Sequence, residues 1–292
     1  MKRILLQTTL LEGAQDNWTI DTFSMLREYL ATLTDEQGNS LYEVTARDRQ
    51  PDAEGNDPVL STLDQQGFDQ LWLFALDVGD GLSQADCAGI TRFHQQGKGI
   101  LATRDHQDMG ISMCPLKAIG GFHYFHSRQP DPDPDRLCRD DTCTLTINYP
   151  NYHSGKNGDF QVIRPLEPMH ELLKDPSLPN GVITRFPAHP HEGGVGVSPG
   201  ADYAQVIAVG TSKVTGREFS LAVAAEQVAD ADGHLLGRVV AQSTFHHFVD
   251  YNWDISKGCP SFVEEPPGDG MATDPQAINE IHAYVRNLAA WL

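Results

Sequence analysis

Short apolar runs alternate with helical patterns from the first residues of this chain, and this order limits the folds open to it. Residues 19–33 and 83–97 place apolar side chains at the spacing of one helix face. Strands that alternate with helices pair in parallel through right-handed crossovers, so the order predicts a doubly wound α/β sheet. The apolar runs expected to form its buried strands are residues 2–9, 41–47, 68–76 and 99–104.

Further strands are expected after a long interruption. Residues 114–200 are rich in Pro, His, Asp and Gly, and we interpret them as a loop-rich insertion or cap within a single domain that spans residues 1–292. The segments predicted within and after the insertion are a strand at 143–148, a short helix near 169–175, strands at 204–210, 219–227 and 237–244, and a closing helix from Pro275.

The charge balance excludes some classes of partner. The chain carries 21 basic and 40 acidic residues, for a net charge of −19, whereas nucleic acids and anionic membranes require a basic face. No apolar stretch approaches the roughly 20 residues of a membrane helix, and the N-terminal run is predicted to be a strand rather than a signal peptide. We therefore expect a cytoplasmic protein with reduced thiols, although Cys138 and Cys143 are close enough to pair in an oxidising compartment.

Polar clusters follow three of the predicted strands. They are Asp77–Gly81, Arg104–Asp108 and Phe245–Asp254. Ligands of open parallel sheets bind beyond the carboxyl ends of the strands, so these clusters predict a site at one rim. The alternative is that the polar side chains only pair with backbone groups released at the strand ends.

The residue types at this rim suit acid–base chemistry. His106 or His246 could move protons near neutral pH, and Asp105 could orient a histidine or bind a substrate hydroxyl. Arg104 could hold a carboxylate, with Asp108 as a further polar contact to substrate.

A second pattern suggests a metal. His189, His191 and Glu192 lie within four residues, and imidazole with carboxylate suits zinc or another transition ion. His123 and His126 would share one face if their segment were helical, and form a weaker candidate pair. A histidine in a loop is, however, more often a hydrogen-bonding group than a ligand.

This order of parts resembles the class I glutamine amidotransferase-like superfamily and, within it, the ThuA-like (trehalose-utilisation) group. The similar segments are "LFALDVGDG" (73–81), "GILATRDHQ" (99–107) and "GRVVAQSTFHH" (237–247). The resemblance implies a flavodoxin-like, mostly parallel sheet with helices on both faces. It also implies an oxyanion-hole amide at Gly79 or Gly81, a nucleophile elbow at 99–107, and a site histidine at His246 or His247.

One departure from this superfamily concerns the nucleophile. Glutaminases of this kind need a cysteine at the elbow, because a thiolate attacks the amide carbon. Here the elbow carries Arg104 and Asp105, while Cys114 lies ten residues downstream of Arg104 and Cys87 lies in the preceding helix. Glutaminase activity is therefore not expected.

Three readings of the chain remain open. The first is a hydrolase or sugar-processing enzyme with an Asp/His-rich pocket, with metal assistance as an option. The second is a non-catalytic protein that binds a metal or a small polar ligand such as a carbohydrate. The third is a structural or subunit-assembly role, and a homo-oligomer is compatible with each. The aromatic residues considered for stacking on a sugar are Trp72, Phe245, Tyr251 and Trp253.

Overall fold

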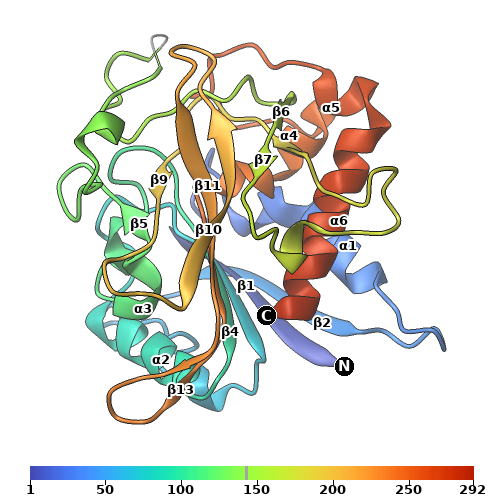
Figure 1. The fold of residues 1–292 in the computed structure, drawn as a ribbon. Coiled ribbons are helices and arrows are strands. Elements are labelled where there is room, and N and C mark those ends of the chain that lie inside the picture. The colour runs from blue at the N-terminus through green and yellow to red at the C-terminus, as the bar shows by residue number, and fades with distance from the viewer. Residues whose placement is uncertain (142–143) are drawn as a thin grey trace.

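A computed structural model describes residues 1–141 and 144–292 and contains a central sheet of eight strands (Figure 1). In spatial order they are β2 (Tyr42–Arg49), β1 (Lys2–Leu11), β3 (Gln70–Phe74), β4 (Gly99–Thr103), β14 (Val239–Gln242), β11 (Glu218–Ala225), β10 (Ala204–Thr211) and β7 (Arg164–Pro165). The first five are parallel, and the last three are added antiparallel. The predicted mostly parallel α/β sheet is therefore confirmed.

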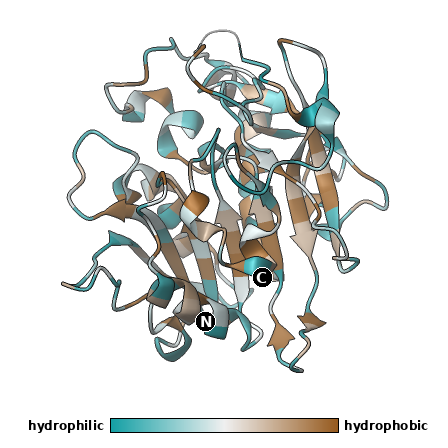
Figure 2. Ribbon diagram, turned by 90° about the vertical axis from the view of Figure 1, so that its left-hand side faces the viewer, coloured by the Kyte–Doolittle hydropathy of each residue, from teal (hydrophilic) through white to brown (hydrophobic). Residues whose placement is uncertain are grey.

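Helices cover both faces of the parallel part. α1 (Ser24–Thr32) and α6 (Pro275–Trp291) pack with Leu6 and Trp72, whereas α2 (Gln84–His94) packs with Leu5 and Leu71. Successive side chains of a strand point to opposite faces, so neighbouring strand residues enter different cores. Figure 2 shows the result, with apolar colour concentrated along the strands and polar colour along the loops above them.

The helix starts follow the predicted capping residues. The Ser83 side chain accepts a hydrogen bond from the Asp86 backbone N–H, and the Asp86 carboxylate accepts one from Ser83 N–H, which completes a capping box. Asp274 caps α6 in a similar way, with Pro275 in the first turn. The helix predicted over 19–33 instead begins as a 3-10 turn, η1 (Ile20–Phe23), before α1.

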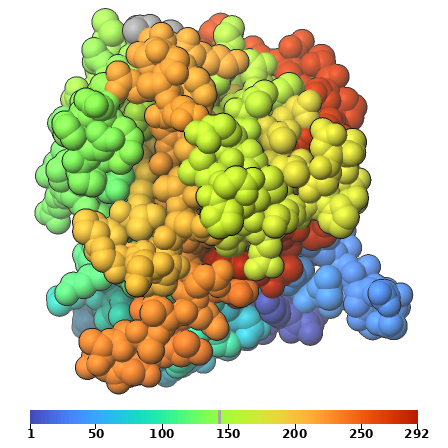
Figure 3. Space-filling view, in the orientation of Figure 1, coloured from blue at the N-terminus to red at the C-terminus, as the bar shows by residue number. Residues whose placement is uncertain are grey.

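The insertion forms small paired elements and little regular structure. α3 (Lys117–Gly120) lies on the α2 side, and the insertion supplies much of the surface in Figure 3. The strand predicted at 143–148 is wrong where it can be compared: Cys143 lies outside the described residues, and 144–148 form a turn and loop. The helix near 169–175 is a single 3-10 turn, η5 (Glu171–Leu173). The strand pairs are β5 (His123–Tyr124) with β9 (Gly194–Val195) and β6 (Phe160–Val162) with β8 (Arg185–Pro187).

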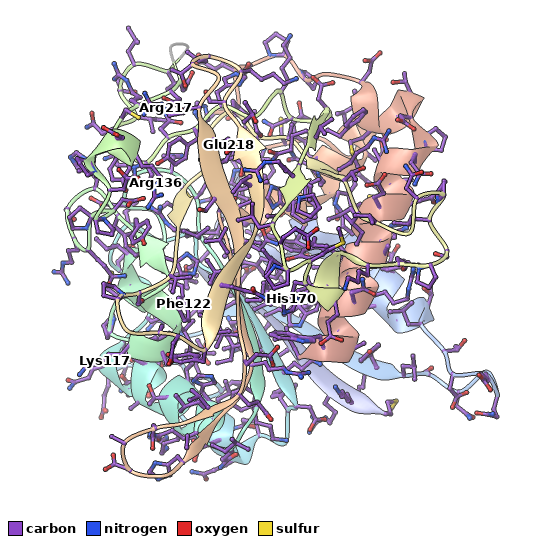
Figure 4. The ribbon with its side chains drawn as sticks, viewed as in Figure 1. Lys117, Phe122, Arg136, His170, Arg217 and Glu218 are labelled. Carbon is purple, nitrogen blue, oxygen red and sulfur yellow. The ribbon has the colours of Figure 1, made fainter. Side chains whose placement is uncertain are left out.

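Short elements fill the connections. Arg217 and Glu218 mark the β10–β11 turn in Figure 4. No helix in the described part of the chain is both long and apolar enough to cross a membrane. The remaining elements are η2 (Leu63–Gln65), η3 (Ile111–Met113), η4 (Pro134–Arg136), β12 (Val228–Ala229), β13 (Leu235–Leu236), η6 (Phe245–His247), α4 (Asp250–Trp253), η7 (Ile255–Lys257) and α5 (Gly270–Thr273).

Candidate functional site

The carboxyl ends of β4 and β14 form one wall of the site. The two strands are parallel neighbours, with Thr103 opposite Gln242, so the residues that follow them leave the sheet side by side. The Phe245 backbone N–H donates to the Arg104 carbonyl at 2.9 Å, which extends the pairing beyond the strands. This geometry places Asp105 and His246 at the same edge of the sheet.

The insertion supplies the opposite wall. The segment between β8 and β9 contains His189 and His191, and it is fixed to β14 where Gly193 N–H donates to the Ser243 carbonyl at 3.0 Å. A Cβ atom at Gly193 would lie 2.3 Å from the Asp105 carbonyl oxygen. The absence of a side chain at Gly193 therefore lets the insertion approach the end of β4 closely.

A cavity of about 390 Å³ lies between these walls. Its polar side chains include Asp105 and four histidines, whereas Trp18, Phe245 and Phe262 form an apolar side. The four histidines are His106, His189, His191 and His246. Glu264 and Glu265 add carboxylates to the lining. A concave site with a few converging polar groups is the usual form of a small-molecule site.

Asp105 is the buried centre of the polar side. Its carboxylate contacts His106 Nδ1 at 2.8 Å and accepts a hydrogen bond from the Thr244 hydroxyl at 2.8 Å, while His189 Nε2 lies 3.4 Å away. Burial opposes ionisation, but His189 and His106 together hold the pKa of Asp105 well below its usual value. The group is therefore a carboxylate at neutral pH.

The His189 and His246 rings are stacked, with centroids 3.5 Å apart. His189 Nδ1 lies 2.8 Å from Asn157 Oδ1, and His246 Nδ1 lies 2.9 Å from Asn252 Oδ1. Burial lowers the pKa of both histidines, which favours their neutral forms.

His191 faces the same cavity from the insertion. Its Nδ1 lies 2.9 Å from Asp141 Oδ2 and 3.2 Å from Asn151 Oδ1. The centroids of the His106 and His191 rings are 5.5 Å apart. Each of these two histidines thus has its Nδ1 held by a carboxylate.

Several residues predicted for substrate binding lie elsewhere. Arg104 is fully buried, and its guanidinium donates to backbone carbonyls, including that of Tyr124 at 2.6 Å. The Asp108 carboxylate accepts a hydrogen bond from Ser127 N–H. Neither side chain lines the cavity, because Arg104 faces the carbonyls of its own loop and of Tyr124, and Asp108 faces the backbone of the insertion.

Glu192 and His247 belong to a separate buried cluster. The Glu192 carboxylate accepts hydrogen bonds from the hydroxyls of Ser154 and Ser243, each at 2.6 Å, and His247 Nε2 lies 3.6 Å from it. Burial opposes ionisation, but His247 and the hydroxyl donors hold the pKa of Glu192 below its usual value. The predicted metal set His189, His191 and Glu192 is therefore divided between two places, since Glu192 does not line the cavity.

The glycines predicted to supply an oxyanion-hole amide also lie away from the cavity lining. Gly79 N–H donates to the Asp77 carboxylate at 3.0 Å, and Gly81 packs against Asp77 and Ser112. The first predicted polar cluster therefore forms its own turn instead of reaching Asp105.

The remaining aromatic and histidine candidates also differ in whether they line the cavity. Phe245 lines the cavity, whereas Trp72, Tyr251 and Trp253 are core residues. His123 is buried in β5, and His126 is exposed. The two therefore share no common face.

The candidate nucleophile elbow after β4 contains no cysteine, and nearby thiols are poorly placed to replace one. Cys87 is buried in α2, and burial raises its pKa to about 11. Burial also raises the pKa of Cys114. Neither residue lines the cavity.

Sequence reasoning missed the asparagines and the tryptophan of the site. Asn157 and Asn252 orient two histidines. Trp18 lies edge-to-face with the His246 ring, with ring centroids 4.9 Å apart. Asn252 stands in the predicted cluster 245–254, but nothing local distinguishes its side chain from its neighbours.

Comparisons with known proteins find solved structures that resemble this chain at low sequence identity. No family model matches the chain, and no curated protein matches it. Similar solved structures include a putative ThuA-like protein from Parabacteroides merdae, with a TM-score of 0.47, 12% identity, and coverage of 92% of this chain and 95% of that one. A cytoplasmic protein from Salmonella typhimurium LT2 has a TM-score of 0.45 and 10% identity, with 99% of each chain covered.

A third similar structure is the glutaminase domain of a Trypanosoma brucei CTPS with bound acivicin. Its TM-score is 0.42 at 13% identity, with 98% of this chain and 94% of that one covered. These likenesses concern the course of the chain and carry no assignment of activity.

Proposed function

We propose that this protein is a hydrolase that acts on a small polar molecule, such as a carbohydrate derivative, without a cysteine nucleophile. The observation that carries the proposal is the contact of 2.8 Å between His106 Nδ1 and the buried Asp105 carboxylate at the cavity wall. A carboxylate that holds Nδ1–H leaves Nε2 of the same ring as a proton acceptor.

The proposed step uses His106 as general base. A water proton passes to His106 Nε2 while the water oxygen bonds to the electrophilic atom of the substrate. The bond to the leaving group breaks, and its electron pair stays with the leaving atom, which then takes the proton back from the imidazolium. Asp105 orients the ring and stabilises its charged form, and His191 lies close enough to contact the same substrate.

A non-catalytic ligand-binding role is the second candidate, and one observation favours it. The cavity has an apolar side in which Trp18 lies edge-to-face with Phe262, with ring centroids 6.4 Å apart, and Phe262 is 56% exposed. Such a surface suits contact with the apolar face of a sugar.

The two candidates are separated by turnover on a panel of nitrophenyl esters, glycosides and anilides. We expect hydrolysis of one class, and we expect His106→Gln to lower kcat by roughly 10²–10⁴-fold while the protein stays folded. His126→Gln, which changes an exposed histidine, is the matched control. Binding without turnover on every class would favour the second candidate, and equal activity of the His106→Gln variant would exclude the general-base role.

The remaining expectations about partners and location stay predictions. The net charge of −19 supports the expectation that neither nucleic acid nor an anionic membrane is a partner. A cytoplasmic location and a homo-oligomeric state belong to the same group of proposals.

A further inference from the structure

We infer that Asp105, His189 and His246 form a binding site for one divalent transition-metal ion. The three side chains are buried, and one ligand atom from each lies within 4.8 Å of the other two. They come from three separate segments: the end of β4, the insertion, and the turn η6 after β14. The inference differs from the sequence-based set, because His191 and Glu192 are not among the ligands.

The hydrogen-bond network fixes which ring nitrogens are free. The Asn252 side-chain amide donates to Asn157 Oδ1 at 3.1 Å and to the Ala188 carbonyl at 2.7 Å. Both asparagine oxygens are therefore oriented as acceptors, and each receives Nδ1–H from the histidine that it contacts. Nε2 is consequently the ring nitrogen that His189 and His246 have left to bind a metal ion.

Nε2 of His189 faces a carboxylate instead of a donor. His189 Nε2 lies 3.4 Å from Asp105 Oδ2, is buried, and has no hydrogen-bond partner among the residues that the structure describes. A buried imidazole lone pair beside a carboxylate oxygen costs free energy unless a cation lies between them. His189 and Asp105 therefore require either a metal ion or a shared proton, and one ligand atom of His246 lies within 4.8 Å of both.

The chemistry of the donors favours a transition ion over the proton. Neutral imidazole and carboxylate are ligands typical of zinc and of non-haem iron, and two histidines with one carboxylate form a common open site. Asn157 and Asn252 supply the outer contacts to Nδ1–H that metal-binding histidines almost always make. One proton between His189 and Asp105 would involve two of the three side chains, whereas a metal ion would bind all three.

The three ligands line the cavity, so a fourth position opens toward the space where the substrate would bind. An ion there would supply an activated water for hydrolysis. In that catalytic role the inference rests on the proposed function, whereas binding of the ion does not. Metal content and hydrolysis are therefore measured separately.

The test measures metal content and affinity in the whole protein. Purified chain is stripped with a chelator, checked for folding by circular dichroism, and titrated with Zn²⁺ and with Co²⁺, whose visible absorption reports its ligands. We expect one ion per chain, and much weaker binding in His189→Ala and His246→Ala. The matched control is His234→Ala, because Asp230, Asp232 and His234 form the other candidate cluster in the described residues and are partly or fully exposed.

A milder variant protects the test against misfolding. Asn157→Leu removes the acceptor of His189 Nδ1–H without changing a ligand, and we expect Zn²⁺ affinity to fall roughly 10–100-fold. Asn287→Leu, which alters an asparagine bonded to the carbonyls of Leu172 and Lys174, should leave the affinity unchanged.

Two results would overturn the inference: a folded wild-type protein with no saturable Co²⁺ or Zn²⁺ binding, or binding that both ligand variants retain and His234→Ala loses. Metal binding without hydrolysis would overturn the proposed function alone. Hydrolysis by metal-free protein would overturn the catalytic role of the ion alone, because the titrations decide whether the ion binds.

Discussion

The chemical role that each histidine of this site can take depends on the partner of its Nδ1 atom. Carboxylates hold Nδ1 of His106 and His191, whereas amide oxygens hold Nδ1 of His189 and His246. A carboxylate partner stabilises a protonated ring, and a neutral amide partner gives much less stabilisation to a buried charge. Four imidazoles in one cavity can therefore divide into two suited to proton transfer and two suited to metal binding.

Arg104 illustrates a residue whose chemistry suggests one role and whose surroundings give another. Its guanidinium donates to the carbonyls of Tyr124, Met109, His106 and Gln107, and its Cζ lies 4.3 Å from the centre of the Phe125 ring. Burial lowers its pKa to about 10, so it stays charged at neutral pH. Arg104 thus fixes the loop that follows β4.

We expect Arg104→Met to lower the free energy of unfolding by at least about 3 kcal/mol, because several buried carbonyls would lose their donors at about 1–3 kcal/mol each. Urea denaturation measures this loss. Arg92→Met is the control, since Arg92 forms an exposed ion pair with Asp64 that should contribute less than about 1 kcal/mol. A fully stable Arg104→Met protein that had lost ligand binding would instead support the substrate-binding role.

At the scale of elements, the site depends on how closely the insertion approaches the sheet. The segment between β8 and β9 lies against the ends of β4 and β14, where Gly193 leaves no room for a Cβ atom. The positions of His189 and His191 therefore depend on this contact as much as on their own segment.

Gly193→Ala should separate the insertion from β4. The new Cβ would collide with the carbonyl oxygens of Asp105 and Ser243, so we expect about 1–3 kcal/mol of destabilisation and weaker Zn²⁺ binding. Gly13→Ala is a matched control: its Cβ meets open space, and only the positive φ of 78° costs free energy, about 1–2 kcal/mol. If Gly193→Ala bound Zn²⁺ as tightly as the Gly13→Ala control, the site would not depend on this approach.

At the scale of the whole molecule, several histidines are buried in neutral form away from the cavity. Burial and the nearby Arg104 charge lower the pKa of His123 to about 3, and burial with Arg286 lowers that of His282 to about 4. Both ring nitrogens of His123 lack a hydrogen-bond partner among the described residues. The unfolded chain therefore binds protons that the folded chain excludes.

The direction of the pH effect follows from these lowered values. The contribution of a neutral buried histidine is fully present above its unfolded pKa of about 6.5 and is lost as the pH falls toward its folded pKa. Between these limits each such histidine lowers stability by about 1.4 kcal/mol for each pH unit of acidification.

His123→Leu should remove the contribution of one neutral buried histidine to the pH dependence of stability. We expect the plot of unfolding free energy against pH, measured by urea denaturation from pH 6 to pH 4.5, to become shallower by about 1.4 kcal/mol per unit. The exposed His126→Leu variant should keep the wild-type slope. An unchanged slope in His123→Leu would mean that the folded protein accommodates the charge.

The sequence by itself determined the parallel strands, the helix faces and the edge of the sheet at which the segments after β4 and β14 meet. Apolar periodicity is local, and parallel pairing carries the residues after neighbouring strands to one edge of the sheet. The absence of a cysteine at the elbow was equally plain.

Only the tertiary structure decided which polar side chains share the cavity. Beyond a strand end the direction of a side chain depends on the loops that pack against it. The insertion brings His189 and Asn157 to Asp105 while it directs Glu192 toward Ser154 and Ser243. No local pattern separates neighbours such as His246 and His247, because their environments come from segments far away in the chain.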